Sequence, residues 1–215
     1  IDIAENCLQR ACDSPSIFIS TMRERALEEA HASKVRARRG SLLGPLDGVP
    51  VAWKDLFDIR GSVTTAGANI FNGLSPAKYD APVVKEVASS GVVSIGKTNL
   101  SELAYSGLGL NPHYGTPTNP YDVGPPRAPG GSSSGSALAV ITGSAAIGVG
   151  TDTAGSLRVP AAFNGLVGFK TSSQRHNRQG VFPLSRTLDS LGSIARTVED
   201  CAAFDACMTT RQGLK

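Results

Sequence analysis

The sequence has little charge, only three histidines and no long hydrophobic run. Charged residues make up 18% of the 215 residues and hydrophobic residues 40%, which excludes a disordered tail and suffices for one buried core. The net charge of +3 is spread along the sequence, so the charge pattern does not predict direct binding of nucleic acid. The basic run at residues 34–40 is interpreted as a solvated helix end. The apolar runs are too short or too rich in glycine to span a membrane, and no signal peptide is visible.

The four cysteines follow no pattern that would build a metal site or a disulfide framework. None of their pairs has CxxC spacing, and no histidine completes a zinc pattern. Scattered cysteines in a chain of this length are typical of reduced, buried thiols. We therefore expect a cytoplasmic protein without metal or cofactor, in which no disulfide joins Cys7, Cys12, Cys201 or Cys207.

Hydrophobic periodicity predicts helices that alternate with short strands. The expected helices lie at about residues 20–39, 80–91 and 136–147. The expected strands lie at residues 49–53, 92–96 and 166–170. The last of the three helices is apolar on all sides, which predicts that it lies in the interior. This alternation indicates an α/β fold, with a mixed, mostly parallel sheet covered by helices on both faces.

One glycine- and serine-rich stretch, "APGGSSSGSALAV" at residues 128–140, ends a long irregular segment that spans residues 107–135. A flexible linker would not open directly onto a buried helix. A Walker phosphate loop needs a lysine that is absent here, and "GGSSSG" is not the dinucleotide-binding pattern, although Asp152 follows at a suitable distance. Long irregular segments in regular domains are often functional, so catalysis by serine is the remaining hypothesis.

A serine nucleophile needs a base, and no histidine is a convincing one. His31 lies on a charged helix and His176 lies among charged and polar residues, so both are expected at the surface. His113 can line a site, although a structural role in its loop is the simpler interpretation. None of the three has an obvious acidic partner, so the sequence offers little support for a Ser-His-Asp triad.

Lys54 is the alternative base, because it ends the apolar run "GVPVAW". A free lysine has a pKa of about 10.4 and is almost fully protonated at neutral pH. Burial among apolar groups lowers that pKa by several units and frees the amine to accept a proton. A simpler interpretation pairs Lys54 with the adjacent Asp55 at the end of a strand, and the residues alone leave both interpretations open.

Three separated blocks resemble the amidase signature family. They are "GPLDGVPVAWKDLFDIRG", "RAPGGSSSGSALAV" and "GTDTAGSLRVPAAFNGLVGFKTS", and the shorter "FPLSRTLDSLGSIARTVEDC" follows them. The resemblance extends from about residue 30 to residue 205, and the order and spacing of the blocks make it specific. It implies the family's fold, in a single domain at residues 1–215 with an N-terminal helical segment at residues 1–40 and a catalytic core at residues 41–215. It also implies that the family's C-terminal part is missing.

The resemblance implies an unusual catalytic triad. Lys54 is its base, Ser132 is the bridging serine that the family holds after a cis peptide bond, and Ser156 is the nucleophile, 24 residues after Ser132. The oxyanion hole would consist of the backbone N–H groups of Thr153, Ala154, Gly155 and Ser156. The family commonly has glycine where this chain has Ala154, which predicts strain if that position needs a positive φ.

Further residues are assigned supporting roles by the same resemblance. Gly130 and Gly131 permit the tight backbone path, Ser133 helps to fix the catalytic loop, and Asp152 and Arg158 hold that loop in place. The expected lining of the substrate pocket is Tyr105, Ser106 and His113.

The implied function is hydrolysis of a carboxylic amide to an acid and ammonia or an amine, through an acyl-enzyme. The alternative is an amidotransferase A subunit, which releases ammonia from glutamine and passes it to a partner protein. A third alternative, a non-catalytic remnant, is disfavoured because Lys54, Ser132 and Ser156 are all present. The expected partners are a small amide substrate and a second copy or partner chain that completes the fold.

Overall fold

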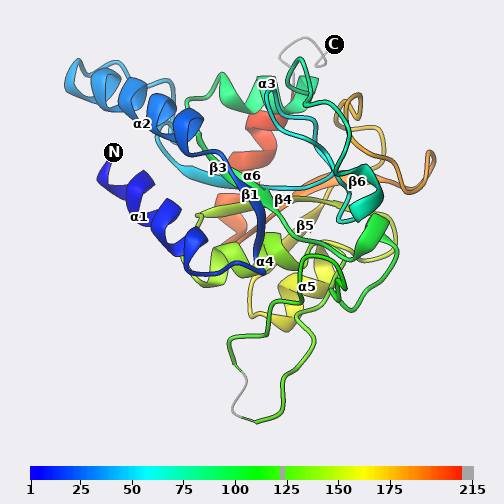
Figure 1. Cartoon of the computed structure of the whole chain (residues 1–215). Helices are drawn as coiled ribbons and strands as arrows, with labels where there is room; N and C mark the ends of the chain where they lie inside the picture. Colours follow the sequence, from blue (N-terminus) through cyan, green and yellow to red (C-terminus); the bar gives the residue numbers. More distant parts are fainter. Residues whose placement is uncertain (122–123, 210–215) are drawn as a thin grey trace.

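A computed structural model describes residues 1–121 and 124–209, in which a six-stranded sheet lies between helices (Figure 1). The strands lie in the order β1-β3-β2-β4-β6-β5. Their bounds are β1 Phe18–Thr21, β2 Pro50–Lys54, β3 Val93–Thr98, β4 Ile147–Asp152, β5 Val167–Lys170 and β6 Ser190–Ala195. Neighbours β3, β2 and β4 are parallel, whereas β1 and β6 run against them and β5 runs against β6. The expected mixed sheet is confirmed, with four of the six strands in one direction.

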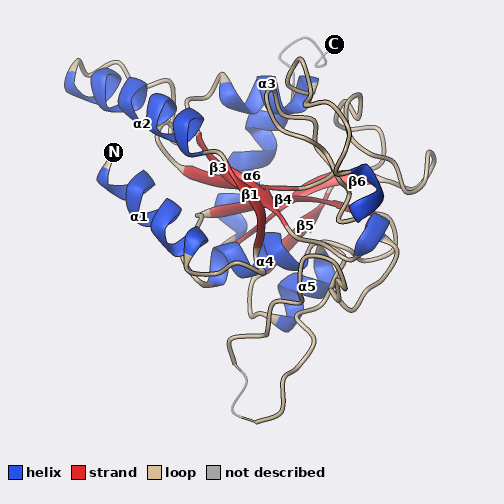
Figure 2. Cartoon of the chain, in the orientation of Figure 1, coloured by secondary structure: helices blue, strands red, loops and turns tan. Residues whose placement is uncertain are grey.

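Helices cover both faces of the sheet (Figure 2). They are α1 Asp2–Cys12, α2 Arg23–Arg38, α3 Pro82–Ala88, α4 Ser134–Ile141, α5 Arg158–Phe163 and α6 Val198–Met208, with short 3-10 turns at Asn69–Phe71 and Glu102–Ala104. Apolar residues of α3 and α6 join Val51 and Trp53 of β2 in one core. Residues of α1, α2 and α4 join Ala52 in a second core, because successive strand residues point to opposite faces.

Two boundaries differ from those predicted. The first 40 residues were expected to be helical, but residues 18–21 form the edge strand β1, which pairs with β3, and α2 begins only at Arg23. The buried helix predicted at residues 136–147 ends at Ile141, because Gly143 adopts a φ of +75° and the chain then enters β4. None of the helices within residues 1–121 and 124–209 has both the length and the apolar character needed to cross a membrane.

The sheet topology brings the sequence motifs together at one place. Strands β2 and β4 are parallel neighbours, so Lys54 at the end of β2 and Asp152 at the end of β4 lie at the same edge of the sheet. Helix α4 starts at Ser134 and packs against β4, which brings the glycine–serine stretch to that edge.

Candidate active site

Lys54 is fully buried, and its amine contacts two hydroxyl groups. Its Nζ lies 2.7 Å from Oγ of Ser132 and 3.1 Å from Oγ1 of Thr151. Burial lowers the pKa of Lys54 to about 7, although the carboxylates of Asp152 and Asp189 act in the opposite direction. A substantial fraction of the amine is therefore neutral near neutral pH and can accept a proton from a hydroxyl group.

Asp55 does not neutralise Lys54, so the simpler interpretation of this lysine is wrong. The carboxylate of Asp55 lies 2.6 Å from Nζ of Lys97, another fully buried lysine. It also accepts hydrogen bonds from the backbone N–H and the hydroxyl of Thr65. Strand register explains the pairing, because β3 brings Lys97 opposite Trp53, one residue before Lys54.

The glycine–serine stretch folds into a tight turn that brings Ser132 into contact with the amine of Lys54. The peptide bond between Gly131 and Ser132 is cis, at the position that the family resemblance implied. Gly130 has a φ of +78°, and a Cβ on Gly131 would lie 2.5 Å from the backbone N of Gly109, so neither position accommodates a side chain. Ser133 follows, and its backbone N–H donates to the carbonyl of Ser156 at 3.2 Å.

Ser156 is half-buried in the loop between β4 and α5, where it lines a cavity of about 250 Å³. Two of the three expected pocket residues, Tyr105 and Ser106, line the same cavity. His113 does not line it; its ring contacts Glu102 and Asn69 instead. The full lining consists of Ala104, Tyr105, Ser106, Gly107, Gly131, Ala154, Gly155, Ser156, Val159 and Leu184.

Asp152 organises the loop that carries Ser156. Its buried carboxylate accepts hydrogen bonds from the N–H groups of Gly155 at 2.7 Å and Leu157 at 3.2 Å. Nε and Nη2 of Arg158 both lie 3.0 Å from the same carboxylate. Burial raises the pKa of Asp152, but these hydrogen bonds outweigh it and hold the pKa below its usual range.

This arrangement corrects part of the predicted oxyanion hole. The N–H of Gly155 already donates to Asp152, so it is not a free donor. Within the described residues, the N–H groups of Thr153, Ala154 and Ser156 donate no hydrogen bond and remain available. The strain considered for Ala154 does not arise, because this residue has no positive φ.

The histidines are placed apart from Ser156, and one is not where the sequence predicted it. His31 is exposed, as expected. His176 is buried, with Nε2 at 2.7 Å from the carboxylate of Asp205. The polar neighbours of His176 in the sequence suggested the surface, but a charged partner from α6 permits its burial.

Two residues of the site were not singled out from the sequence. Thr151 contacts Lys54 because β4 lies beside β2. Asp189 lies directly before β6, and its negative charge raises the pKa of Lys54. Both occur within the family-like blocks, in "GTDTAGS" and "TLDSLGS". Only the pairing of β2, β4 and β6 reveals that they share a site.

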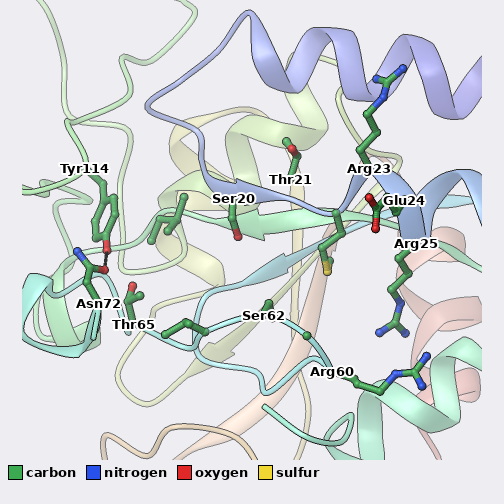
Figure 3. Close-up of a pocket in the computed structure, with 14 residues that line it drawn as sticks. Ser20, Thr21, Arg23, Glu24, Arg25, Arg60, Ser62, Thr65, Asn72 and Tyr114 are labelled. Carbon is green, nitrogen blue, oxygen red and sulfur yellow. Dashed lines mark hydrogen bonds between the residues drawn. The ribbon is translucent and has the colours of Figure 1, made fainter. Parts of the chain in front are cut away.

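The most voluminous cavity among those described lies elsewhere (Figure 3). It measures about 730 Å³ beside the edge strand β1, and none of the predicted site residues lines it. Its residue Arg25 is neutralised, because its guanidinium binds both carboxylate oxygens of Asp80 at 2.7 and 2.9 Å. Its residue Tyr114 hydrogen bonds to Asn72. The smaller cavity is the candidate active site, because it is lined by Ser156, the nucleophile that the sequence predicts.

Comparisons with known proteins show the family of the chain. The model of the family described as Amidase matches residues 2–213. The chain is 45% identical over 184 residues to the AtzE subunit of 1-carboxybiuret hydrolase from Pseudomonas sp. (strain ADP), covering 85% of this chain and 40% of that protein. It is 41% identical over 211 residues to the glutamyl-tRNA(Gln) amidotransferase A subunit from Ralstonia nicotianae (strain ATCC BAA-1114 / GMI1000), covering 97% of this chain and 42% of that protein. The chain thus spans about two fifths of the length of these relatives.

Solved structures are similar over nearly the whole chain. A structure of native peptide amidase from Stenotrophomonas maltophilia superimposes with a TM-score of 0.88 at 36% identity, covering 98% of this chain and 44% of that one. A structure from work on a vestigial protein complex and the origins of an s-triazine catabolic enzyme has a TM-score of 0.93 at 39% identity, covering 100% of this chain and 47% of that one.

Proposed function

The chain belongs to the amidase family, and from that premise we propose that it carries the nucleophile, relay and base of an enzyme that hydrolyses a carboxylic amide to an acid and ammonia or an amine. The observation that carries the proposal is the contact of 2.7 Å between the buried amine of Lys54 and the hydroxyl of Ser132. A lysine whose pKa is about 7 is suited to general base catalysis near neutral pH.

In the proposed acylation step, a proton moves in two transfers. Neutral Lys54 accepts the proton of Ser132, and Ser132 accepts that of Ser156. Oγ of Ser156 attacks the amide carbonyl, and a tetrahedral intermediate forms. When this intermediate collapses, the C–N bond breaks, and the proton returns through Ser132 to the leaving nitrogen. Water then attacks the ester of Ser156 by the same path and releases the acid.

The negative oxygen of the intermediate needs donors that are already in position. The free N–H groups of Thr153, Ala154 and Ser156 are proposed to supply them, since they belong to the loop that lines the cavity. Loss of one such donor typically costs about 3–4 kcal/mol of transition-state stabilisation. The carboxylate of Asp152 supports the loop from behind, together with Arg158.

A fluorophosphonate probe tests the proposal on the 215-residue chain. This reagent modifies only an activated serine, so intact-mass measurement should show one adduct, which peptide mapping should place on Ser156. Ser156→Ala should abolish the adduct, and Lys54→Ala should slow its formation by at least about a hundredfold, the usual scale for loss of a general base. The exposed Ser41 provides a matched control, because Ser41→Ala should react like the wild type.

Failure to form an adduct with a chain shown to be folded would contradict the proposal. A second assay distinguishes the alternative of an amidotransferase component. Release of ammonia from glutamine, with no hydrolysis of simple aryl amides, would favour that alternative over the free-standing hydrolase.

A further inference from the structure

Asp189 lies directly before β6, at the place where β4 ends. Its neighbour Ser190 pairs with Asp152 in the sheet, so Asp189 is adjacent to the start of the loop that carries Ser156. The residue is only 6% exposed. A buried carboxylate is costly unless several donors satisfy it, so its partners indicate what it is there to hold.

The carboxylate of Asp189 connects two separate segments. One oxygen accepts a hydrogen bond from the hydroxyl of Thr153 at 2.5 Å. The other accepts from the backbone N–H groups of Leu184 at 2.9 Å and Ser185 at 3.0 Å. All three donors point at one side chain, and the backbone carbonyl of Asp189 accepts from Arg178 at 2.9 Å.

These two segments form walls of the serine cavity. Thr153 begins the loop whose next three residues line this cavity, and Leu184 lines it from another side. The residues on either side of Leu184, Pro183 and Ser185, line a neighbouring cavity of about 240 Å³. The segment at residues 182–185 is therefore a partition between two cavities, and Asp189 fixes its distance from the nucleophile loop.

The charge of Asp189 also acts on the base. Asp152 and Asp189 are the two carboxylates whose charges raise the pKa of Lys54 against the larger effect of burial. The neighbouring Lys97–Asp55 pair is neutral as a unit. Loss of the negative charge at Asp189 should therefore lower the pKa of Lys54 further.

We propose that Asp189 is a positioning residue for catalysis, which holds the Thr153 loop and the Leu184 turn in one arrangement around Ser156. The inference rests on the proposed function and adds Asp189 to the residues that serve it. A carboxylate accepts from all three groups at once and makes charge-assisted hydrogen bonds with them. An amide of the same size keeps one accepting oxygen for the two backbone N–H groups, but its NH₂ group only donates, so the hydroxyl of Thr153 would have to turn from donor to acceptor and the charge-assisted hydrogen bonds would be lost.

The test compares Asp189→Asn with wild type in labelling by the fluorophosphonate probe, measured as a second-order rate constant from pH 5 to 9. Displacement of a nucleophile loop by about 1 Å can cost about a hundredfold in rate, so we expect labelling to slow by about ten- to a hundredfold. We also expect the acid limb of the pH profile to move to lower pH, because the pKa of Lys54 falls. A purely structural role would not move this limb.

Asp205→Asn is the matched control. Asp205 is 7% exposed and accepts from Arg175 and His176, and within the described part of the chain none of its hydrogen bonds involves a residue that lines the serine cavity. This variant should lower thermal stability and leave the labelling rate of the folded protein and its acid limb unchanged. If Asp189→Asn behaves in the same way, the proposed positioning role is wrong.

Thr153→Val provides a second route if Asp189→Asn fails to fold. It removes only the hydroxyl that donates to Asp189 at 2.5 Å. Labelling should slow by about three- to tenfold, without a shift of the acid limb of the pH profile. Unchanged labelling would overturn the proposal. Absence of labelling in the wild type would overturn the proposed function and this inference together. Labelling of the wild type with an unaffected Asp189→Asn would overturn the inference alone.

Discussion

Lys54 lies fully buried in a site that disfavours the charged form of its amine. Ordinary buried lysines are compensated by a carboxylate, as Lys97 is by Asp55 in this chain. Lys54 instead contacts two neutral hydroxyls, those of Ser132 and Thr151. Burial lowers the pKa of both lysines, but the contact with Asp55 favours the charged form of Lys97, whereas the hydroxyls in contact with Lys54 carry no charge. This difference separates a structural ion pair from a candidate base.

Replacement of Lys54 by methionine should increase stability at pH 7 and abolish activity. The folded-state pKa of about 7 lies below the ordinary 10.5, so the folded chain binds fewer protons than the unfolded chain between these values. That gap corresponds to about 5 kcal/mol, from which loss of two hydrogen bonds subtracts about 2 kcal/mol. We expect Lys54→Met to raise the unfolding free energy by about 3 kcal/mol at pH 7.

The stability advantage of Lys54→Met over wild type should shrink as the pH rises from 7 to 10.5. The unfolded wild-type chain then loses the lysine proton as well, so folding no longer has to remove it. Urea unfolding at several pH values measures this, with Lys34→Met as the control for loss of an exposed lysine. A constant difference between Lys54→Met and wild type across this range would contradict a depressed pKa.

At the scale of elements, α4 and β4 approach each other more closely than side chains normally allow. The first residues of α4 are small, and Oγ of Ser136 donates to the carbonyl of Val149 at 2.9 Å. Gly148 faces the helix, and a Cβ there would lie 2.3 Å from the backbone O of Ser136. This close packing places the turn that holds Ser132 directly over the carboxyl ends of β2 and β4.

Gly148→Ala should destabilise the fold by about 1–3 kcal/mol, the usual cost of overpacking, since backbone atoms rather than a flexible side chain must move. It should also reduce probe labelling, because α4 moves together with Ser132. Gly73→Ala is the control, since Gly73 has no neighbour within 4 Å of the added methyl group. Chemical denaturation of both variants measures the effect, and equal stabilities would refute the close approach.

At the scale of the whole molecule, ion pairs connect segments that are distant in sequence. Arg25 on α2 binds Asp80 before α3, and Arg175 binds Asp205 on α6. The α6 contact also involves the buried His176, so polar contacts attach the last described helix to the loop at residues 172–179, while apolar residues of α6 pack in the core. The arrangement predicts that carboxylate protonation loosens several parts of the molecule together.

Stability should therefore fall at acid pH. The hydrogen bonds from Arg36 lower the pKa of Asp47 to about 2, and although burial raises the pKa values of Asp80, Asp152 and Asp205, their hydrogen bonds lower them overall. Folded-state values below the ordinary 3.8 mean that this stabilisation is complete above about pH 4 and is lost as the pH falls.

Asp47 alone should account for about 2 kcal/mol of this loss, from the difference between 3.8 and about 2. Urea unfolding from pH 6 to pH 2.5 measures the total effect. Asp47→Asn should be less stable at pH 6 and should lose less on acidification, whereas an identical pH dependence in both proteins would show that the pair with Arg36 contributes nothing.

The alternation of helices and strands, the family and the candidate triad could be predicted from the sequence, because local periodicity and the order of three motifs are properties of the chain alone. The sequence did not determine which lysine pairs with Asp55, that His176 is buried, or that Gly155 donates its N–H to Asp152. Nor did it single out Thr151 and Asp189 as neighbours of the base. These features depend on tertiary structure, since strand register and helix docking bring together groups that lie tens of residues apart.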